Sequence, residues 1–416
     1  MRIAIVAEGD FSRNNRLLKL ARSLTAAGHV VARFGIRAAE GQQLCESTDA
    51  GEVILTVTGT EDLAAVRANG GRAESSVKLR VLTAVKRLAA GSSFANDLRH
   101  YFGRRRECSL LYRTVRAWRP DAIVSVNPTM MRVGAWGQRE ADSLFIYDAQ
   151  EIWVETYPRE RRVMRVLYSR LERRLAKRCD LVLTVNDEIA DLMARRMGIN
   201  RPMVLMNGVS ECLPPTPVHR PLRVLFQGAF AANRGLISFI QQMDHLRGKA
   251  VFTLQGFGEI EAPARALVKS RGLEDTVSFA EPCPPEDVVV SANQHDLGLM
   301  VWELTTENLV YASPNKLFDY LGAGLALLAV DAPVLRRFVD TAGCGVLIPE
   351  DRLDEAWQFV AALADDPCRV EELKQGAHRL CPTLLWDVAV APFLEWIENQ
   401  EPAGRSLSSM PSPEEL

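Results

Sequence analysis

The most specific chemical pattern in the chain is the segment YASPNKLFDYLGAGLALLAV at 311–330. Its Ser-Pro-Asn opening is typical of a helix start. Asn315 and Lys316 then fall in the first turn, where free N–H groups and the helix dipole attract phosphate. Asp319 follows one turn later and could accept both hydroxyls of a ribose, as acidic residues do in other nucleotide-binding turns. The alternative is a capped helix with an exposed lysine.

A glycine and an arginine follow the apolar run LRVLFQG, in the stretch GAFAANRG. Gly228 would let the backbone approach a ligand, and Arg234 lies beside Gly235 at the expected start of the next helix. A guanidinium next to free helix N–H groups makes a diphosphate site. The alternative is a tight strand-to-helix turn with a solvated arginine.

Gly256 and Gly258 form a second glycine-rich turn after the run AVFTLQG. The turn begins like a dinucleotide fingerprint, but Glu261 stands where the third glycine belongs. This favours a plain strand-to-helix turn over an NAD site, and both glycines stay candidates for contact with a nucleotide.

Polar residues also follow two apolar runs in the first half of the chain. Gly9, Asn14 and Arg16 come after RIAIVAE and could face a diphosphate or a second substrate; the alternative is a loop and a helix cap. Gln150 and Glu151 come after LFIYDA, at the expected edge of the sheet. A polar run after a strand is also what a surface loop contains.

Two sheets are expected to position these residues. In the first half, short apolar runs without alternation are separated by amphipathic segments, which indicates a parallel sheet covered by helices on both faces. The expected strands are RIAIVAE, HVVARFG, DAIVSVN at 121–127, LFIYDA at 144–149 and LVLTVN at 181–186, with a helix over 14–27. Residues 74–119 are expected to be a mostly helical, basic insertion.

The same alternation restarts after the proline-rich stretch at 206–221, which is typical of an interdomain linker. The expected strands are LRVLFQG, AVFTLQG, VSF, DLGLMVW, LALLAV and GVLIP, with helices from about 236, near 260–271 and over 315–323. We therefore predict an α/β fold of two Rossmann-like doubly wound domains facing across a cleft, with ligands at the carboxyl ends of the strands. The expected division is an acceptor-side domain at 1–209, a linker at 210–221, a nucleotide-binding domain at 222–385, a C-terminal helix at 386–400 that packs back on the first domain, and a disordered tail at 401–416.

The composition excludes several classes of protein. With 47 % hydrophobic and 25 % charged residues the chain is typical of a globular protein, and no stretch approaches the roughly 20 apolar residues of a membrane span. The start turns acidic at Glu8 and Asp10, which indicates a strand rather than a signal peptide. The eight cysteines contain no CxxC pair, which argues against a zinc knuckle and a disulfide scaffold and favours a reducing cytoplasm.

Charge is divided unevenly along the chain. The first 200 residues hold 33 Lys and Arg against 23 Asp and Glu, whereas the remainder holds 17 against 29. The excess gathers at 99–107 and 159–178, and in the latter apolar residues recur at helical spacing. One face of that helix could lie peripherally on an anionic membrane surface; the alternative is a solvated face on a packed helix. No nucleic-acid partner is expected.

Taken in chain order, these motifs resemble family 4 of the retaining glycosyltransferases, which have the GT-B fold. The resemblance spans nearly the whole chain up to about residue 400 and rests on the order and spacing of the motifs. The residues that carry it are Asp10, Arg16, Ala21, Leu24, Gly28, His29 and Val31, DAQE at 148–151, NGV at 207–209, GxxxxxRG at 228–235, GxG at 256–258 and SPNKLFDYLGAG at 313–324.

The resemblance implies transfer of a sugar from a nucleoside diphosphate to an acceptor with retention, with UDP as the default nucleotide and no other cofactor. Arg234 and Lys316 would contact the donor diphosphate, Asp319 would hold the ribose, and residues near 280–282 would border the base. Gln150 or Glu151 would touch the sugar. The sequence contains no DxD motif, so a metal-independent reaction is expected, with two cations in place of a metal ion.

Two positions depart from the pattern of that family. Tyr311 stands at the first acidic position of the E-x7-E element, whose second position is Asp319. Gln150 stands where the family often has a histidine that meets the donor sugar. Glutamine can hydrogen-bond a hydroxyl but cannot carry a proton, so either the donor sugar differs or another group does that work.

Other interpretations stay open at this point. A nucleotide-sugar epimerase or hydrolase would share the architecture and would form product without an acceptor. A non-catalytic scaffold or partner subunit would account for Tyr311 and Gln150, and a nicotinamide dehydrogenase is disfavoured by the missing third glycine. The acceptor is also open, because a lipid or glycan of the cell envelope and a small secondary metabolite fit equally well.

Overall fold

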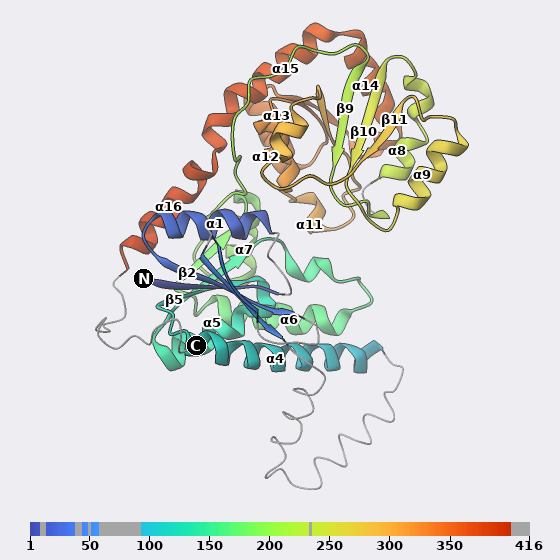
Figure 1. Cartoon of the computed structure of the whole chain (residues 1–416). Coiled ribbons are helices and arrows are strands. Elements are labelled where there is room, and N and C mark those ends of the chain that lie inside the picture. The colour runs from blue at the N-terminus through green and yellow to red at the C-terminus, as the bar shows by residue number, and fades with distance from the viewer. Residues whose placement is uncertain (9–13, 38–43, 49–50, 58–92, 233–234, 401–416) are drawn as a thin grey trace. The chain divides into compact units, whose positions relative to one another are not determined.

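The computed structural model describes residues 1–8, 14–37, 44–48, 51–57, 93–232 and 235–400 (Figure 1). The chain forms two compact units. The first comprises residues up to Leu205 together with the segment from Pro392 onward, and the second comprises Met206–Ala391. The change of unit therefore comes at 205/206, and the segment at 210–221 that we predict as a linker lies within the second unit. The predicted tail at 401–416 lies outside the described residues.

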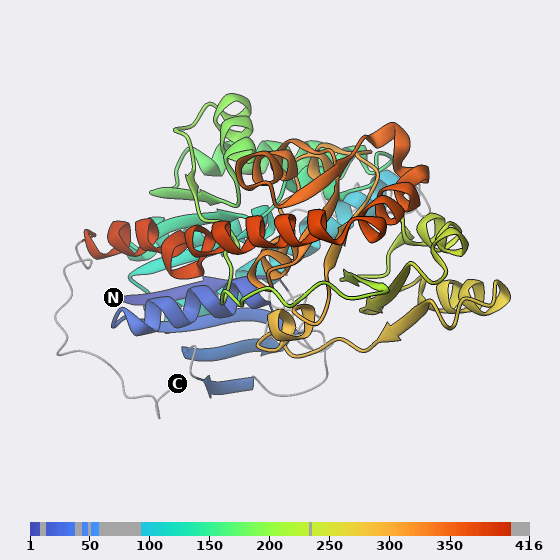
Figure 2. The ribbon, with the colours of Figure 1, turned by 90° about the horizontal axis from the view of Figure 1, so that it is seen from above.

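The first unit contains an eight-stranded sheet in the order β3-β4-β2-β1-β5-β6-β7-β8, in which only the β3–β4 pair is antiparallel. Its elements are β1 (Arg2–Val6), α1 (Asn15–Ala26), β2 (Val30–Arg37), β3 (Leu44–Thr48), β4 (Gly51–Val57), α4 (Ser93–Ala117), β5 (Ala122–Val126), α5 (Asn127–Ala141), β6 (Leu144–Ala149), η1 (Trp153–Thr156), α6 (Arg162–Ala176), β7 (Leu181–Thr184), α7 (Asp187–Met197) and β8 (Met203–Val204). The five predicted strands and the helix at 14–27 are confirmed. The sequence does not predict β3 and β4, which lie at one edge of the sheet (Figure 2).

Helices cover both faces of this sheet, with α1 on one face and α4 on the other (Figure 1). The apolar stripe of α4 includes Cys108, Leu111 and Val115, which are fully buried and pack in one cluster with Phe34 of β2. The spacing of three and four residues puts them on one side of the helix. The predicted helical insertion thus has its described part in α4, and residues 74–92 lie outside the described part.

The second unit contains a six-stranded parallel sheet in the order β11-β10-β9-β12-β13-β14. Its elements are β9 (Leu222–Gln227), α8 (Leu236–Ile240), η3 (Met243–Leu246), β10 (Ala250–Gln255), α9 (Glu261–Ser270), β11 (Val277–Ala280), α10 (Val288–Ala292), β12 (Leu297–Met300), α11 (Glu307–Val310), α12 (Asn315–Gly322), β13 (Ala326–Val330), α13 (Pro333–Ala342), β14 (Gly345–Ile348), η4 (Glu350–Glu355), α14 (Ala356–Asp365), α15 (Pro367–Leu380) and η5 (Cys381–Leu384). Helix α16 (Trp386–Glu398) begins in this unit and belongs to the first unit from Pro392. Every predicted strand of this half is present.

The apolar runs lack alternation because both faces of the second sheet are covered. Val224 and Phe226 of β9 enter one hydrophobic cluster, whereas Leu225 between them enters another. In each sheet the strand order reverses at one place, between β1 and β5 in the first and between β9 and β12 in the second. Ligands of doubly wound folds bind outside the carboxyl ends of the strands at such a reversal.

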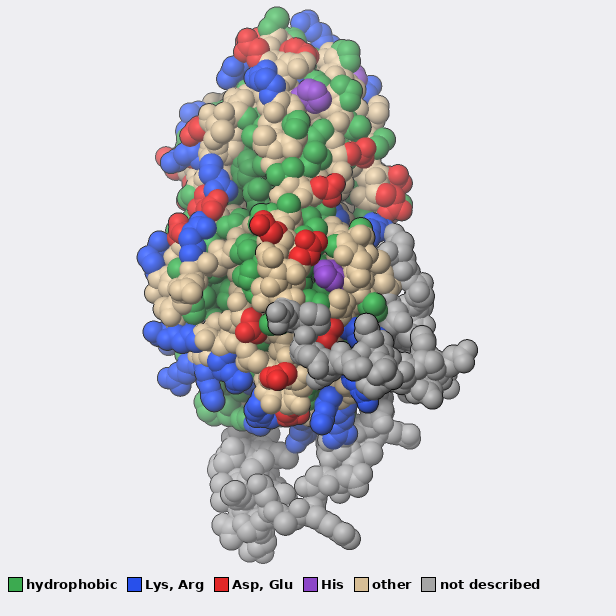
Figure 3. Space-filling model, turned by 90° about the vertical axis from the view of Figure 1, so that its left-hand side faces the viewer, with side chains coloured by type: hydrophobic (Ala, Val, Ile, Leu, Met, Phe, Trp, Pro, Cys, Tyr) green, Lys and Arg blue, Asp and Glu red, His purple; other side chains and the backbone are tan. Residues whose placement is uncertain are grey.

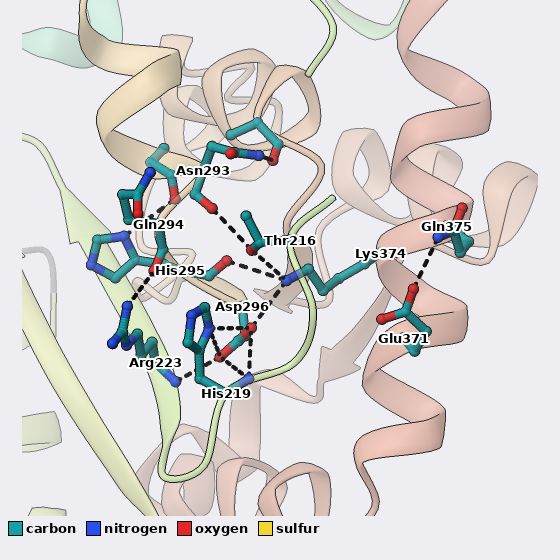
Figure 4. A network of polar contacts seen from close by, with 12 residues as sticks. Thr216, His219, Arg223, Asn293, Gln294, His295, Asp296, Glu371, Lys374 and Gln375 are labelled. Carbon is teal, nitrogen blue, oxygen red and sulfur yellow. Dashed lines mark hydrogen bonds and ion pairs between the residues drawn. The ribbon is translucent and has the colours of Figure 1, made fainter. Parts of the chain in front are cut away.

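A buried ion pair holds the opposite, amino end of the second sheet together (Figure 4). Asp296 precedes β12 and accepts from Nζ of Lys374 in α15 at 3.0 Å, and both side chains are fully buried. The same carboxylate accepts the backbone N–H groups of His219 and Arg223 at 3.2 and 2.9 Å. One carboxylate therefore joins the segment before β9, the start of β12 and helix α15.

One pair of cysteines corrects the sequence-based expectation of unpaired thiols. Cys212 and Cys381 form a disulfide, with Cα atoms 5.9 Å apart and 169 residues between them in the chain. Nearby, the N–H of Val209 donates to the carbonyl of Leu384 at 2.7 Å, and the N–H of Trp386 donates back to Val209 at 2.9 Å. The segment after residue 206 and the segment after α15 are thus fastened to each other within the second unit.

Candidate functional site

Lys316 lies at the strand-order reversal of the second sheet. Its Nζ donates to the carbonyl of Leu299 in β12 at 3.3 Å and lies 4.4 Å from the ring centroid of Phe226 in β9. The ring of Trp302, just after β12, is 5.6 Å from the same nitrogen. Lys316 is half-buried. The structure therefore holds a positive charge against aromatic faces at the place where this fold class binds ligands.

The other two candidates of this segment lie on the same helix. Asn315 is exposed at the first position of α12, which begins after Pro314 as the sequence predicts. Asp319 is half-buried one turn later. Burial raises the pKa of the Cys283 thiol and the charge of Asp319 adds to that rise, so Asp319 faces the loop after β11. This is the side of the sheet on which the sequence places the border of a base, near 280–282.

The glycines after β9 and β10 form two stacked turns. Gly228 has φ 130° and Gly256 has φ 152°, and a Cβ on Gly256 would stand 1.9 Å from the carbonyl oxygen of Gly228. A Cβ on Gly258 would stand 2.5 Å from the carbonyl oxygen of Phe230. Side chains are therefore excluded by backbone packing and by the left-handed conformation. Close packing of the two turns explains the Gly-x-Gly pattern without a dinucleotide.

Hydrogen-bonded polar side chains, which the sequence did not predict, lie along the same edge of the sheet. Gln227 ends β9 and its Nε2 donates to Oε1 of Gln255, which ends β10, at 2.8 Å. Nε2 of Gln255 in turn donates to the carbonyl of Glu281 at 3.2 Å, and Oε1 of Gln227 has no hydrogen-bond partner within the described residues. Ser313 likewise has a buried hydroxyl without a partner at the entry to α12. The dipeptide Gln-Gly occurs at the ends of both β9 and β10, and this repeat in the sequence could have predicted that the two glutamines lie side by side.

Arg16 in the first unit has a partner other than the expected anionic ligand. Its side chain is buried and donates to both carboxylate oxygens of Asp148 in β6, at 3.2 and 2.7 Å. It also donates to the carbonyl of Leu205 at 2.7 Å. Arg16 therefore fixes α1 to β6 and to the end of the first unit, and Asp148 holds its charge.

The neighbouring candidates of the first unit are placed around this ion pair. Gln150 is half-buried, and its Nε2 donates to Asp148 at 2.9 Å; Glu151 is half-buried beside it. Asn14 caps α1 by accepting the N–H of Leu17 at 3.2 Å, which is the alternative that the sequence offers for it. Two candidates, Gly9 and Arg234, lie outside the described residues.

A second polar cluster of the first unit lies where α4 and α6 meet. The ring of Tyr101 in α4 is 5.4 Å from that of Tyr168 in α6, and Tyr157 stacks on Tyr168 with centroids 5.7 Å apart. Arg132 of α5 places its guanidinium 4.6 Å from the centroid of Tyr101. Glu8, just after β1, pairs with Arg104 of α4. This cluster lies near the strand-order reversal of the first sheet, and no local pattern in the sequence predicts it.

The described residues offer contacts to two parts of a nucleotide, its phosphate groups and its ribose. At the second sheet, a lysine, a carboxylate, amide side chains and backbone groups suit a nucleotide, since a cation can meet phosphate and a carboxylate can meet ribose hydroxyls. No group of three or more His, Cys, Asp or Glu side chains in the described part is arranged to hold a metal ion.

Comparison with solved structures defines the fold class. The Anabaena protein HepE in complex with UDP and glucose superposes with a TM-score of 0.67, at 13 % identity, over 96 % of this chain and all of that one. Sucrose-phosphate synthase from Thermosynechococcus elongatus superposes with a TM-score of 0.66, at 15 % identity, over 96 % of this chain and 98 % of that one. The fold is that of the GT-B glycosyltransferases.

Sequence similarity to glycosyltransferases covers about half of the chain. Residues 14–208 match the Glycosyl transferase 4-like domain. The chain is 24 % identical over 215 residues to GDP-mannose:cellobiosyl-diphosphopolyprenol alpha-mannosyltransferase of Xanthomonas campestris, which covers 49 % of this chain and 54 % of that protein. It is 28 % identical over 216 residues to D-inositol 3-phosphate glycosyltransferase of Thermomonospora curvata, covering 50 % of this chain and 45 % of the relative. The chain is thus similar to group 1 glycosyltransferases and spans about half the length of the curated relatives it matches.

Proposed function

We propose that this protein transfers a sugar from a nucleoside diphosphate donor to an acceptor, with retention and without a metal ion. The observation that carries the proposal is Lys316, whose Nζ lies at the reversal of the second sheet between β9 and β12. Negative charge builds on the diphosphate as it leaves, and a cation fixed beforehand lowers the energy of that transition state. Arg234 would supply the second cation.

The remaining contacts follow from the same edge of the second sheet. Asp319 would accept the ribose hydroxyls, and the loop beyond β11, near 280–282, would border the base. Asn315 would meet phosphate at the start of α12. UDP is the first nucleotide to test, in part because the similar HepE structure contains UDP and glucose. No further cofactor is required, because the diphosphate is itself the leaving group.

The first unit would contribute the acceptor side and the contact with the sugar, through Gln150 or Glu151. In this proposal Gln150 hydrogen-bonds a hydroxyl of the sugar while Asp148 and Arg16 fix its position. The chemistry requires orientation and charge stabilisation, which hydrogen bonds from fixed side chains supply. A glutamine at this place carries no proton, so no acid–base step is assigned to it.

The acceptor is proposed to be a lipid-linked or otherwise anionic molecule, reached at a membrane surface on the cytoplasmic side. The relative from Xanthomonas campestris is named for a diphosphopolyprenol acceptor. In this chain, α4 and α6 carry exposed arginines that form no ion pair with a carboxylate of the described part, namely Arg105, Arg106, Arg113, Arg162, Arg170, Arg173 and Arg174. Lys and Arg side chains gather over the first unit on the face shown in Figure 3. No helix of the described part is long and apolar enough to cross a membrane.

Nucleotide binding and product formation test the proposal directly. Purified protein is titrated with UDP, GDP, ADP and dTDP, with and without magnesium, and the variant Lys316→Met is compared with Lys269→Met, which removes an exposed lysine of α9. One nucleoside diphosphate should bind without magnesium, at least tenfold more weakly to Lys316→Met and unchanged to Lys269→Met.

The outcome of the reaction separates the alternatives. Transfer that depends on an added acceptor, with the donor's anomeric configuration kept in the product by NMR, is expected. Product formed without any acceptor would instead identify an epimerase or hydrolase. Absence of binding to all four nucleotides would contradict the proposal and favour a scaffold.

A further inference from the structure

Arg132 of α5 is a buried cation that forms no ion pair with a carboxylate of the described residues. Its side chain is 9 % exposed, its guanidinium lies over the ring of Tyr101, and its Nη1 has no hydrogen-bond partner within the described residues. Other arginines of the first unit contrast with it, because Arg16 pairs with Asp148 and Arg104 pairs with Glu8. A cation taken out of water without a counter-charge costs stability. Such a cost is explained if an anion binds there.

Two neutral donors accompany this cation. Thr129 lies in the first turn of the 15-residue helix α5, one turn before Arg132, and is 1 % exposed. Tyr168 of α6 is fully buried. The hydroxyls of both residues have no hydrogen-bond partner in the part of the chain that the structure describes. Buried polar groups are normally paired, so two such hydroxyls near one unpaired cation indicate that a ligand completes the set.

The electrostatics of Tyr168 link it to Arg132. Burial raises the pKa of Tyr168, so its hydroxyl stays protonated and able to donate, and the positive charge of Arg132 is close enough to oppose that rise. Glu8 also faces Tyr168, but its carboxylate is paired with Arg104. Glu8 therefore already has a cationic partner in Arg104, whereas the structure gives Arg132 no such ion pair within the described residues.

We propose that Arg132, Thr129 and Tyr168 bind an anionic oxygen group of the acceptor, a phosphate or a carboxylate. This inference rests on the proposed function for its acceptor and on the structure for its chemistry. The start of α5 contributes a favourable dipole and lies at the end of β5, beside the strand-order reversal of the first sheet. Arg132 supplies the charge, and the hydroxyls of Thr129 and Tyr168 fix the orientation of the oxygens.

The test uses the full-length protein and simple anions. Thermal unfolding and calorimetric titration are measured with inorganic phosphate and with malonate, against sodium chloride at equal ionic strength. The variants are Arg132→Met and Tyr168→Phe, with Arg113→Met as the control, since Arg113 is exposed on α4. Wild type and the control should bind one of the two anions. Arg132→Met should bind it at least tenfold more weakly, and Tyr168→Phe several-fold more weakly.

A merely structural arginine would give a different result. If Arg132 forms an anion-binding site, the Arg132→Met variant should have an unfolding temperature equal to or above that of wild type when no anion is added. The reason is that the substitution removes a buried charge that lacks a counter-charge. Tighter binding of phosphate or of malonate shows whether the site prefers a phosphate or a carboxylate group. Equal anion binding by Arg132→Met and wild type, or no binding to wild type, would overturn the inference. Binding of UDP, GDP, ADP and dTDP is measured in every variant. If nucleotide binding persists when anion binding is lost, only this inference fails; if wild type binds none of the four nucleotides, the proposed function fails.

Discussion

At the scale of single residues, Arg16 and Lys316 are both candidate ligands of an anion, but they differ in their partners within the protein. Arg16 is buried and satisfied by Asp148, whereas Lys316 is half-buried and held by one carbonyl and two aromatic rings. An arginine engaged at both carboxylate oxygens has little left to offer a ligand. A lysine over aromatic faces can still turn donors toward an anion. The donor site is therefore expected at the second sheet.

Replacing Asp319 tests the ribose contact. Asp319→Ala should weaken nucleotide binding by about 1 to 3 kcal/mol, because it removes hydrogen bonds made by a charged acceptor. Binding of the nucleoside diphosphate is measured by calorimetry, with Asp331→Ala as a control outside this helix. Unchanged affinity in the folded Asp319 variant would remove this residue from the donor site.

Glu172 should make stability depend on pH. Burial raises its pKa to about 7, although the hydroxyl of Tyr147, which donates to it at 2.6 Å, opposes the rise. The folded state therefore binds a proton more tightly than the unfolded state, and this contribution is lost as pH rises from about 4.5 to about 7. Glu172→Gln should be more stable than wild type at pH 8, by on the order of 1 to 3 kcal/mol, and similar at pH 4.5.

Chemical denaturation across this pH range measures the effect. Glu286→Gln, which changes an exposed carboxylate of the second unit, serves as the control and should follow wild type at every pH. A Glu172→Gln variant less stable than wild type at pH 8 would mean that the ionised carboxylate is favoured in the folded protein.

At the scale of elements, the buried pair of Asp296 and Lys374 explains how α15 is attached to the second sheet. The carboxylate serves two backbone N–H groups as well as the ammonium group. Nζ of Lys374 also lies 3.3 Å from the hydroxyl of Thr216, in the segment that the sequence predicts as a linker. That segment is thus held to α15 and β12, because one buried charge recruits partners from each of them.

Two Lys–Asp pairs of the second unit allow a matched test of burial. Lys374→Met should lower the free energy of unfolding by about 3 kcal/mol, because it leaves a buried carboxylate without its counter-charge. Lys249→Met breaks a 2.6 Å pair with Asp365 whose side chains are exposed, and should cost less than about 1 kcal/mol. Denaturant unfolding of both variants is the measurement, and equal losses would show that burial does not set the value of the Lys374 pair.

At the scale of the whole molecule, charge and apolar exposure coincide in the first unit. Phe94 and Phe102 of α4 and Val166 of α6 are 56, 52 and 47 % exposed, on the helices that carry the exposed arginines Arg105, Arg106 and Arg170. Basic side chains beside exposed apolar ones are typical of surfaces that bind anionic membranes. The basic segments seen in the sequence and the exposed apolar side chains seen in the structure both support the proposal that the protein acts at a membrane surface.

Vesicle binding tests the membrane contact. The protein should sediment with vesicles that contain anionic phospholipid, and less with neutral vesicles or at high salt, since screening weakens exposed charges. Replacing Arg105, Arg106 and Arg170 by glutamine should reduce binding severalfold. Replacing Arg195, Arg196 and Arg369, which lie on other helices, should not. Equal loss in both triple variants would mean that total charge, not this surface, governs binding.

The sequence by itself determined the strands other than β3, β4 and β8, and it indicated the start of α12 and the cap of α1. Each of these depends on neighbours within one turn or one strand. Local patterns also located the glycine turns at Gly228 and Gly256, although only the structure showed that backbone contact forbids a side chain at Gly256 and that Gly228 has a positive φ. The family resemblance likewise follows from motif order, which the sequence contains in full.

Only the tertiary structure decided which charges are satisfied. Arg16 and Asp148 are 132 residues apart in the chain, and Cys212 and Cys381 are 169 apart, so no local pattern could predict either pair. The same holds for Arg132, since an arginine in a helix is ordinary until the fold buries it without an ion pair among the described residues. Burial and partners over long separations arise from packing, which is why the structure alone distinguishes a paired charge from one that awaits a ligand.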